Sequence, residues 1–232
     1  MNQIQQLQLS NLQGRVEATA YCLRGTLSDQ PKKDDYLSSE EHAIAQQLPA
    51  NRQATFRLGR FLLKTIATSI FNIPMAEVTT SKGTFEQPIL KHPELLDYSC
   101  SITHSADQVM VLLFPRSHPM AVDMEYISQP EERIQAIETQ LTYQEKQQCS
   151  LLNIPHSHLL LWSAKEALSK CLGTGLMVPF TLLETVQLAQ KNEQTTMEFK
   201  NFGQYRAISL QGQEYLITIC YPANHRLLGW AN

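Results

Sequence analysis

The sequence predicts an α/β (α+β) protein made of two similar lobes. Two segments with helical periodicity, FRLGRFLLKTIA (56–67) and WSAKEALSKCLG (162–173), each carry a stripe of charged side chains beside apolar positions. Strand-rich sequence of comparable length follows each of them. A chain of 232 residues is long enough for two small, closely packed lobes. We therefore expect a duplicated architecture, in which each lobe takes about half of the chain.

In the first half, VEATAYCL (16–23) alternates between apolar and other residues and predicts a half-buried strand. A Ser-Ser-Glu-Glu start predicts a helix over 38–48, and a longer helical pattern runs over 51–71. Residues 79–93 contain a glycine and two prolines and are predicted to be a loop. Residues 100–114 then predict a strand, a turn and an apolar strand.

In the second half, residues 118–127 predict a strand, and residues 130–152 are rich in helical pattern. The helix that contains WSAKEALSK is expected to have Ser157 as its N-cap. Two strands, YRAISL (205–210) and YLITICY (215–221), are expected to be joined by a turn near the glycine between them.

Composition indicates an ordinary globular protein, with 43% hydrophobic and 18% charged residues and a net charge of −3. No basic excess points to nucleic acid, and the longest apolar runs, such as VMVLLF (109–114), are too short to cross a bilayer. The five cysteines are scattered without CxxC spacing, and the N-terminus shows no signal-peptide pattern. We expect a reduced, cytoplasmic protein with neither nucleic acid nor membrane as a partner.

Asp123 and Glu125 are the first candidate site residues. Positions i and i+2 of a strand point to the same side, so the two carboxylates of AVDMEYI (121–127) project together. Neighbouring carboxylates repel each other unless a cation lies between them, and oxygen ligands suit Mg²⁺. The alternative is a half-exposed strand whose acids are solvated.

The helix near residue 165 supplies a second group of candidates. Trp162, Lys165, Glu166 and Lys170 fall on one face at 3.6 residues per turn. A solvated face with a Glu166–Lys170 pair is the simpler interpretation. Trp162 on the same face weakens this interpretation, because a large aromatic residue would normally lie in the core.

Two further groups of candidates lie in the first half of the chain. Arg57, Arg60 and Lys64 form a basic stripe on the predicted long helix. His104, in SITHSAD (101–107), follows a predicted strand, where a locally bonded turn histidine is the usual alternative to a functional one.

Taken in order along the chain, these motifs resemble the 4′-phosphopantetheinyl transferases of the surfactin-synthetase type, which include the enterobactin-type enzymes. AVDMEYI is similar to the family's G-[VI]-D-[IV]-E motif, and WSAKEALSK to its [WF]-x-x-K-E-[AS]-x-x-K motif. SITHSAD is similar to its S-H-S segment, and ANRQATFRLGRFLLK (50–64) to its arginine-rich helix. The resemblance runs from about residue 50 to residue 175.

The resemblance implies a two-lobed monomer, with an N-terminal lobe over 1–118 and a C-terminal lobe over 119–232. Each lobe is expected to be a small sheet on a long helix, with the active site in the cleft. Mg²⁺, or Mn²⁺ as an alternative, would be held by Asp123, Glu125 and Glu166. The residues expected to contact the phosphates of coenzyme A are Arg57, Arg60, His104, Lys165 and Lys170. The catalytic residues would be Glu166, as metal ligand or as base, with Lys165 and Lys170.

The implied reaction is transfer of the phosphopantetheine arm of coenzyme A to a serine of an apo acyl or peptidyl carrier protein. Such carriers serve fatty-acid, polyketide or nonribosomal-peptide synthesis. Lys146 and Arg133 are candidates for a basic patch that meets the carrier. The alternatives are a catalytically idle relative that binds coenzyme A or a carrier, and a different Mg²⁺-dependent phosphotransferase. The absence of a Walker-type loop disfavours the second alternative.

Two positions depart from the family pattern. Ala121 replaces the usual glycine before the D-x-E motif. Gln87 stands where the family often has a lysine that meets a coenzyme A phosphate, and Lys82 or Lys91 is a candidate to replace it. The position of Gln87 keeps the idle-relative alternative open.

Overall fold

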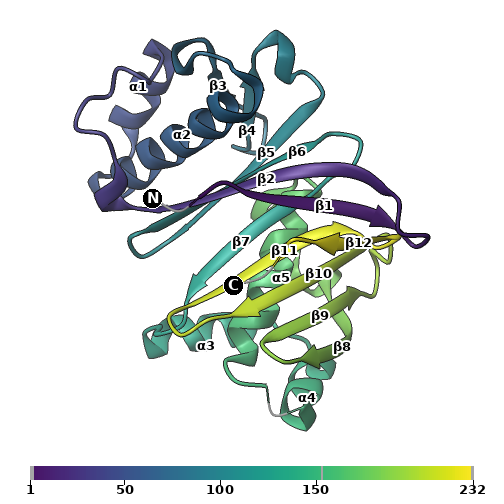
Figure 1. Cartoon of the computed structure of the whole chain (residues 1–232). Coiled ribbons are helices and arrows are strands. Elements are labelled where there is room, and N and C mark those ends of the chain that lie inside the picture. Colours follow the sequence, from purple (N-terminus) through teal and green to yellow (C-terminus); the bar gives the residue numbers. More distant parts are fainter. Residues whose placement is uncertain (1–2, 153, 231–232) are drawn as a thin grey trace. The chain divides into compact units, whose positions relative to one another are not determined.

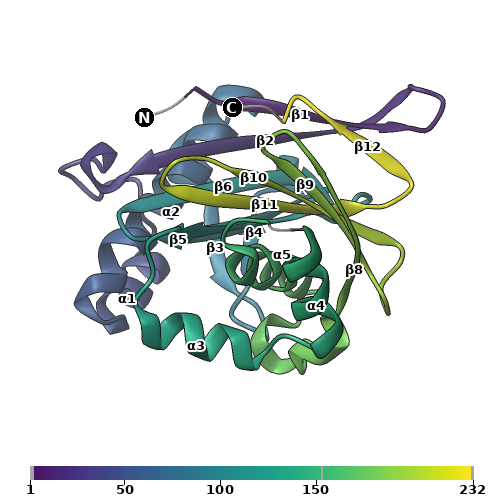
Figure 2. The same cartoon turned by 90° about the horizontal axis from the view of Figure 1, so that it is seen from below.

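The computed structural model describes residues 3–152 and 154–230. The chain divides into two compact units, drawn in Figures 1 and 2. Unit 1 comprises Met1–Pro119 and Arg226–Gly229, and unit 2 comprises Met120–His225 and Trp230–Asn232. Each unit contains an antiparallel sheet packed with helices, which confirms the predicted α+β class and the two lobes.

Unit 1 contains the first half of the elements. Its strands are β1 (Gln5–Asn11), β2 (Val16–Thr26), β3 (Thr79–Lys82), β4 (Pro88–Lys91), β5 (Tyr98–Ser105), β6 (Gln108–Pro115) and the returning β12 (His225–Leu228). Its helices are α1 (Ser39–Gln47), α2 (Ala50–Phe71) and the short 3₁₀ turns Leu27–Asp29, Met75–Glu77 and Pro93–Leu95. The main sheet has the order β12-β1-β2-β6-β5, and β3 and β4 form a separate hairpin.

Helix α2 packs its apolar stripe on β2 and β6 and forms the core of unit 1 (Figure 1). Leu58, Leu62 and Ile66 of this stripe are fully buried. Each such side chain contributes roughly 1.5–3 kcal/mol of burial free energy. Gly59 permits the close approach of helix and sheet, because a Cβ there would lie 3.1 Å from a methyl of Ile102. The arginine-rich helix therefore has its glycine where it meets the sheet.

Unit 2 contains the remaining elements. Its strands are β7 (Ala121–Tyr126), β8 (Thr185–Lys191), β9 (Gln194–Phe199), β10 (Tyr205–Gln211) and β11 (Tyr215–Pro222). Its helices are α3 (Glu131–Thr139), α4 (Tyr143–Leu152), α5 (Ser157–Cys171) and the 3₁₀ turns Gly175–Met177 and Phe180–Leu183. The sheet order is β7-β11-β10-β9-β8.

Helix α5 is the central helix of unit 2 and packs on β7, β10 and β11 (Figure 2). Leu161, Ala164 and Leu168 are fully buried along its apolar stripe, as the periodicity predicts. Gly173 follows its C-terminus with a positive φ of 68°, and its N–H bonds back to the carbonyl of Lys170. The predicted N-cap is wrong by one residue, because His156 occupies the capping position and the helix begins at Ser157.

The two units repeat one topology. The order β2-β6-β5 in unit 1 matches β7-β11-β10 in unit 2, and the hairpin β3–β4 corresponds to β8–β9. Helix α1 corresponds to α4, and α2 corresponds to α5. The repeat is incomplete in three respects among the described elements: β4 contacts β5 without joining its sheet, β1 and β12 extend the sheet of unit 1, and α3 has no counterpart among the α-helices of unit 1. The faint sequence repeat is therefore a true duplication of the fold.

One predicted loop is wrong, because 79–93 contains the strands β3 and β4. Pro88 is the first residue of β4, a position where its missing N–H disturbs the ladder least. Polar strands β1, β8 and β9 were also not predicted, since long apolar runs do not mark them. In QQLQLSN of β1, the alternation of Leu7 and Leu9 was the available signal.

Candidate metal centre

Strand β7 carries two carboxylates into the interior of unit 2. Asp123 and Glu125 are only 4% and 6% exposed. Their neighbours Val122 and Met124 are also buried, so β7 is covered on both faces. The alternative of solvated acids on a half-exposed strand therefore does not apply. A buried carboxylate requires polar partners, and both residues have them.

The partners of Glu125 come from three directions. Its Oε1 accepts hydrogen bonds from the indole N–H of Trp162 at 2.9 Å and from the guanidinium of Arg133 at 2.7 Å. The amide of Gln129 lies 3.4 Å from the other oxygen. The sequence predicted that Trp162 shares a helical face with charged residues. The hydrogen bond explains its position there, because the indole N–H donates to a carboxylate.

Asp123 is held by α5. The ammonium of Lys170 lies 2.6 Å from its Oδ1 and also donates to the backbone carbonyl of Val122 at 3.3 Å. The Lys170 side chain is 26% exposed, so this ion pair is partly screened by solvent. The structure therefore brings Lys170 to the D-x-E strand.

Glu166, one turn before Lys170 on α5, belongs to the same electrostatic cluster. Burial, and then the charge of Asp123, raise the pKa of Glu166 to about 7. Burial and Asp123 likewise raise the pKa of Glu125 to about 7, with Glu166 adding to the effect. Three carboxylates thus share a poorly solvated site, in which burial and a neighbouring negative charge oppose ionisation of Glu125 and Glu166.

The donor set fits a hard divalent cation. Three carboxylates face two basic side chains, Lys170 and Arg133, so the fully ionised cluster keeps one net negative charge. Oxygen ligands in small number, with room for water and phosphate oxygens, are the environment that Mg²⁺ prefers. Burial and then repulsion by Asp123 raise the pKa of Glu125 and Glu166, and a bound dication would oppose both effects by stabilising the ionised carboxylates.

Lys165 does not extend toward this cluster, contrary to the prediction. Its side chain is fully buried, and its ammonium lies 2.7 Å from the carboxylate of Glu145. It also donates to the carbonyls of Gln140 and Phe180, at 3.1 Å each. All three donors of the ammonium are used inside the core, so Lys165 holds α5 to neighbouring segments and is not available to a phosphate.

The predicted phosphate contacts of unit 1 have different environments. Arg60 is almost fully buried, with its guanidinium 4.4 Å from the ring centre of Phe56 and 3.8 Å from Glu41, so the predicted basic stripe of this helix is buried at this position. Arg57 pairs with Asp34 and keeps about a quarter of its side chain exposed. His104 is half-buried and lies within β5, one residue before the strand ends.

Gln87 lies in the β3–β4 turn of unit 1. Its side-chain oxygen accepts a hydrogen bond from the backbone N–H of Phe85 at 2.9 Å, so it stabilises the turn locally. The two lysines considered as substitutes are engaged at the surface, Lys82 with Glu86 and Lys91 with Glu40. Surface pairs of this kind are weak, so both lysines can exchange partners at little cost.

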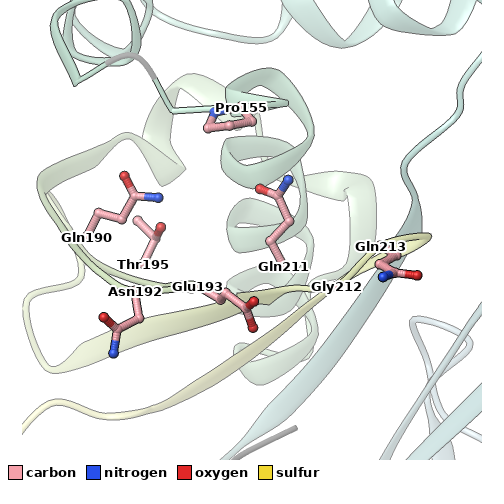
Figure 3. A pocket seen from close by; sticks show the side chains of 8 residues that line it. All are labelled: Pro155, Gln190, Asn192, Glu193, Thr195, Gln211, Gly212 and Gln213. Carbon is pink, nitrogen blue, oxygen red and sulfur yellow. The ribbon is translucent and has the colours of Figure 1, made fainter.

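A pocket of about 610 Å³ lies elsewhere in unit 2, beside the β8–β9 and β10–β11 turns (Figure 3). Its lining is rich in uncharged amides, and Glu193 is its one ionisable residue among those described: Pro155, Gln190, Asn192, Glu193, Thr195, Gln211, Gly212 and Gln213. It contains no carboxylate of the cluster. A site with so little charge is unsuited to a metal-bound phosphate.

Sequence reasoning missed Glu145, Gln129 and the pairing of Arg133 with Glu125. A signal existed for Glu145, because Thr142-x-x-Glu145 is a capping box, as is Ser38-x-x-Glu41. No local pattern marks the long-range partner of such a glutamate.

The fold and the site together define a domain built around a buried carboxylate cluster suited to a divalent cation. Residues 119–220 match the family model of the 4′-phosphopantetheinyl transferase superfamily (ACPS). That stretch is therefore a domain of this superfamily, and it contains both β7 and α5. No curated protein matches the chain. Within the described ranges, no helix has the length and apolar character needed to span a membrane.

Proposed function

We propose that the protein is a 4′-phosphopantetheinyl transferase of the surfactin-synthetase type. It would move the phosphopantetheine arm of coenzyme A to a serine of an apo acyl or peptidyl carrier protein and release adenosine 3′,5′-bisphosphate. The observation that carries the proposal is the clustering of the buried Asp123 and Glu125 with the partly buried Glu166 within the superfamily domain. The repeated topology of the two units supports the two-lobed architecture that the resemblance to this type implies.

The proposed roles follow from the contacts of each side chain. Asp123, Glu125 and Glu166 would hold Mg²⁺, which supplies charge neutralisation for the pyrophosphate of coenzyme A. Lys170, already beside Asp123, adds a positive charge for a phosphate oxygen. Glu166, whose pKa burial and Asp123 raise to about 7, is well matched to accept the serine proton when it is not a ligand.

Coenzyme A would also be contacted by His104 and Arg57, which keep solvent-accessible surface. We assign Lys165 and Arg60 to the packing of their helices instead, because both are buried. The partly buried Trp162–Glu125 hydrogen bond would fix the orientation of one metal ligand.

Intact mass spectrometry of an apo carrier protein incubated with enzyme, coenzyme A and Mg²⁺ tests the proposal. We expect a gain of one phosphopantetheinyl group that EDTA abolishes. Glu166→Gln and Asp123→Asn should lower the rate by at least about 100-fold, because each removes a proposed ligand of the Mg²⁺ that would neutralise charge on the transferring group. Glu132→Gln, an exposed change on α3, is the matched control and should keep full activity.

Failure to modify any of several unrelated carriers, together with measurable binding of coenzyme A, would contradict transfer and support an idle coenzyme A-binding relative. Wild-type turnover by Glu166→Gln would contradict the assignment of the site.

A further inference from the structure

Arg133 has an unusual position for a basic surface residue. Its side chain is 44% exposed, yet its Nη2 lies 2.7 Å from Oε1 of Glu125, a carboxylate whose side chain is 8% exposed. Its guanidinium also lies 6.0 Å from the ring centre of Trp162, which donates to the same oxygen. Arg133 is thus partly exposed to solvent and at the same time forms an ion pair with one of the proposed metal ligands.

A cation bound by the cluster would compete with Arg133. Mg²⁺ binds carboxylate oxygens at about 2.0–2.1 Å, and Oε1 of Glu125 is already occupied by two donors. Glu166 also lies within the field of the Arg133 charge. Placing a dication among these oxygens brings two positive groups into contact range, so occupation of the site favours departure of the guanidinium.

Of the two basic residues, Arg133 is the one that can leave. Lys170 is 26% exposed and also donates to the backbone of Val122. Arg133 is more exposed and lies on α3, a short helix at the surface. Water can solvate its guanidinium with little rearrangement of the core.

Once released, Arg133 would lie beside a metal-bound anion. Its neighbours on α3, Glu131, Glu132 and Glu138, are exposed acids, and Arg133 is the one basic residue of this helix. This surface disfavours an acidic protein as the partner of Arg133. A phosphate group, which a guanidinium binds bidentately, fits better because it needs only one local cation.

We infer that Arg133 is a phosphate-positioning residue whose partner changes when the metal binds. It pairs with Glu125 in the metal-free protein, and it binds a substrate phosphate once the carboxylates hold Mg²⁺. This inference rests on the proposed function for the identity of the phosphate, the pyrophosphate of coenzyme A. It replaces the earlier expectation that Arg133 belongs to a patch for the carrier protein.

Trp162 provides a readout that does not depend on turnover. The chain has two tryptophans, and Trp230→Phe leaves Trp162, whose N–H bonds to Glu125, as the single reporter. In this background, Mg²⁺ is titrated by fluorescence. Inorganic pyrophosphate and coenzyme A are then titrated in separate arms by calorimetry, with EDTA and with saturating Mg²⁺.

We expect Arg133→Gln to tighten Mg²⁺ binding by roughly 3- to 10-fold and to weaken pyrophosphate binding in Mg²⁺ by about 10-fold, the value of one charge-assisted hydrogen bond. Coenzyme A should weaken in parallel. Arg133→Lys, which keeps the charge without the planar fork, should leave Mg²⁺ affinity near wild type and recover part of the phosphate affinity. Lys191→Gln, exposed on β8, is the charge-matched control and should change neither.

Weaker Mg²⁺ binding by Arg133→Gln would overturn the inference, because the arginine would then be a support for Glu125. Unchanged pyrophosphate binding in Mg²⁺ would overturn it as well. Both arms are independent of transfer, so a protein that fails to modify carriers can still confirm the exchange.

Discussion

The ammonium of Lys165 and the carboxylate of Glu145 form a fully buried ion pair at 2.7 Å in unit 2. Lys64 and Glu41 form the same pair at the same distance in unit 1. In both units the second oxygen of the glutamate accepts the N–H and the hydroxyl of a threonine that begins or lies in a strand: Thr185 in unit 2, Thr80 in unit 1. The Lys–Glu pair is therefore a feature of the duplicated fold. The equivalent pair of unit 1, Lys64 with Glu41, lies outside the carboxylate cluster, which indicates a structural role for both pairs.

Lys165→Met and Lys64→Met should each lower the free energy of unfolding by about 3–5 kcal/mol, because each leaves a glutamate buried without its counter-ion. Adding Glu145→Gln to Lys165→Met should recover part of the loss, since the stranded charge is removed. Urea unfolding of the single and double variants measures this. If Lys165→Met were as stable as wild type but bound coenzyme A more weakly, the structural role would be contradicted and a phosphate contact by Lys165 would be supported.

The carboxylate cluster should make the metal-free protein less stable as pH rises. Burial and Asp123 raise the folded-state pKa of Glu125 and Glu166 to about 7, above the usual value of about 4.5. The folded state therefore holds protons that the unfolded state releases, so stability present at low pH is lost as pH rises toward and through 7. Between pH 6 and pH 8 in EDTA we expect a loss of about 2–3 kcal/mol from the two groups together.

Urea unfolding at the two pH values, with Glu166→Gln beside wild type, measures this loss. The variant should lose less stability over the interval, and Mg²⁺ at pH 8 should recover the loss in wild type. An equal loss in both proteins would show that the cluster does not cause it.

Trp162→Phe should weaken Mg²⁺ binding by about 10-fold while keeping the fold, because it removes a hydrogen bond that orients Glu125. The phenyl ring keeps most of the packing on Phe180, whose ring centre lies 4.7 Å from that of Trp162. Calorimetric titration of Mg²⁺ and thermal unfolding are the two measurements. Wild-type Mg²⁺ affinity in this variant would show that the indole serves packing alone.

Gln87→Lys should lower the KM for coenzyme A about 3-fold or more with kcat unchanged, because it adds a cation where the proposed function would place a coenzyme A phosphate. It also removes the acceptor of the Phe85 N–H, so the β3–β4 turn should lose about 1 kcal/mol of local stability. Steady-state kinetics with Gln87→Met as the uncharged control separates the two effects. Equal KM values for both variants would show that this turn is remote from the phosphates.

Much of the site was predictable because its determinants are local. The period of two in β7 puts Asp123 and Glu125 on one side, and the period of 3.6 in α5 puts Trp162, Glu166 and Lys170 on one face. Lys165 shows where that reasoning ends. A helical face spans about 100°. Residues at one edge of it can therefore contact the carboxylate cluster, while a residue at the other edge, such as Lys165, is buried in the core.

The sequence by itself determined the class of the fold, its duplication and the candidate residues of the carboxylate cluster, since periodicity and motif spacing are properties of neighbouring positions. Only the tertiary structure decided that Lys165 is paired with Glu145, that Arg60 is buried against Phe56, and that Arg133 lies on Glu125. These outcomes depend on which segments pack together and on the cost of burying an unpaired charge. The residues of one short segment determine neither which segments pack together nor the cost of burying an unpaired charge.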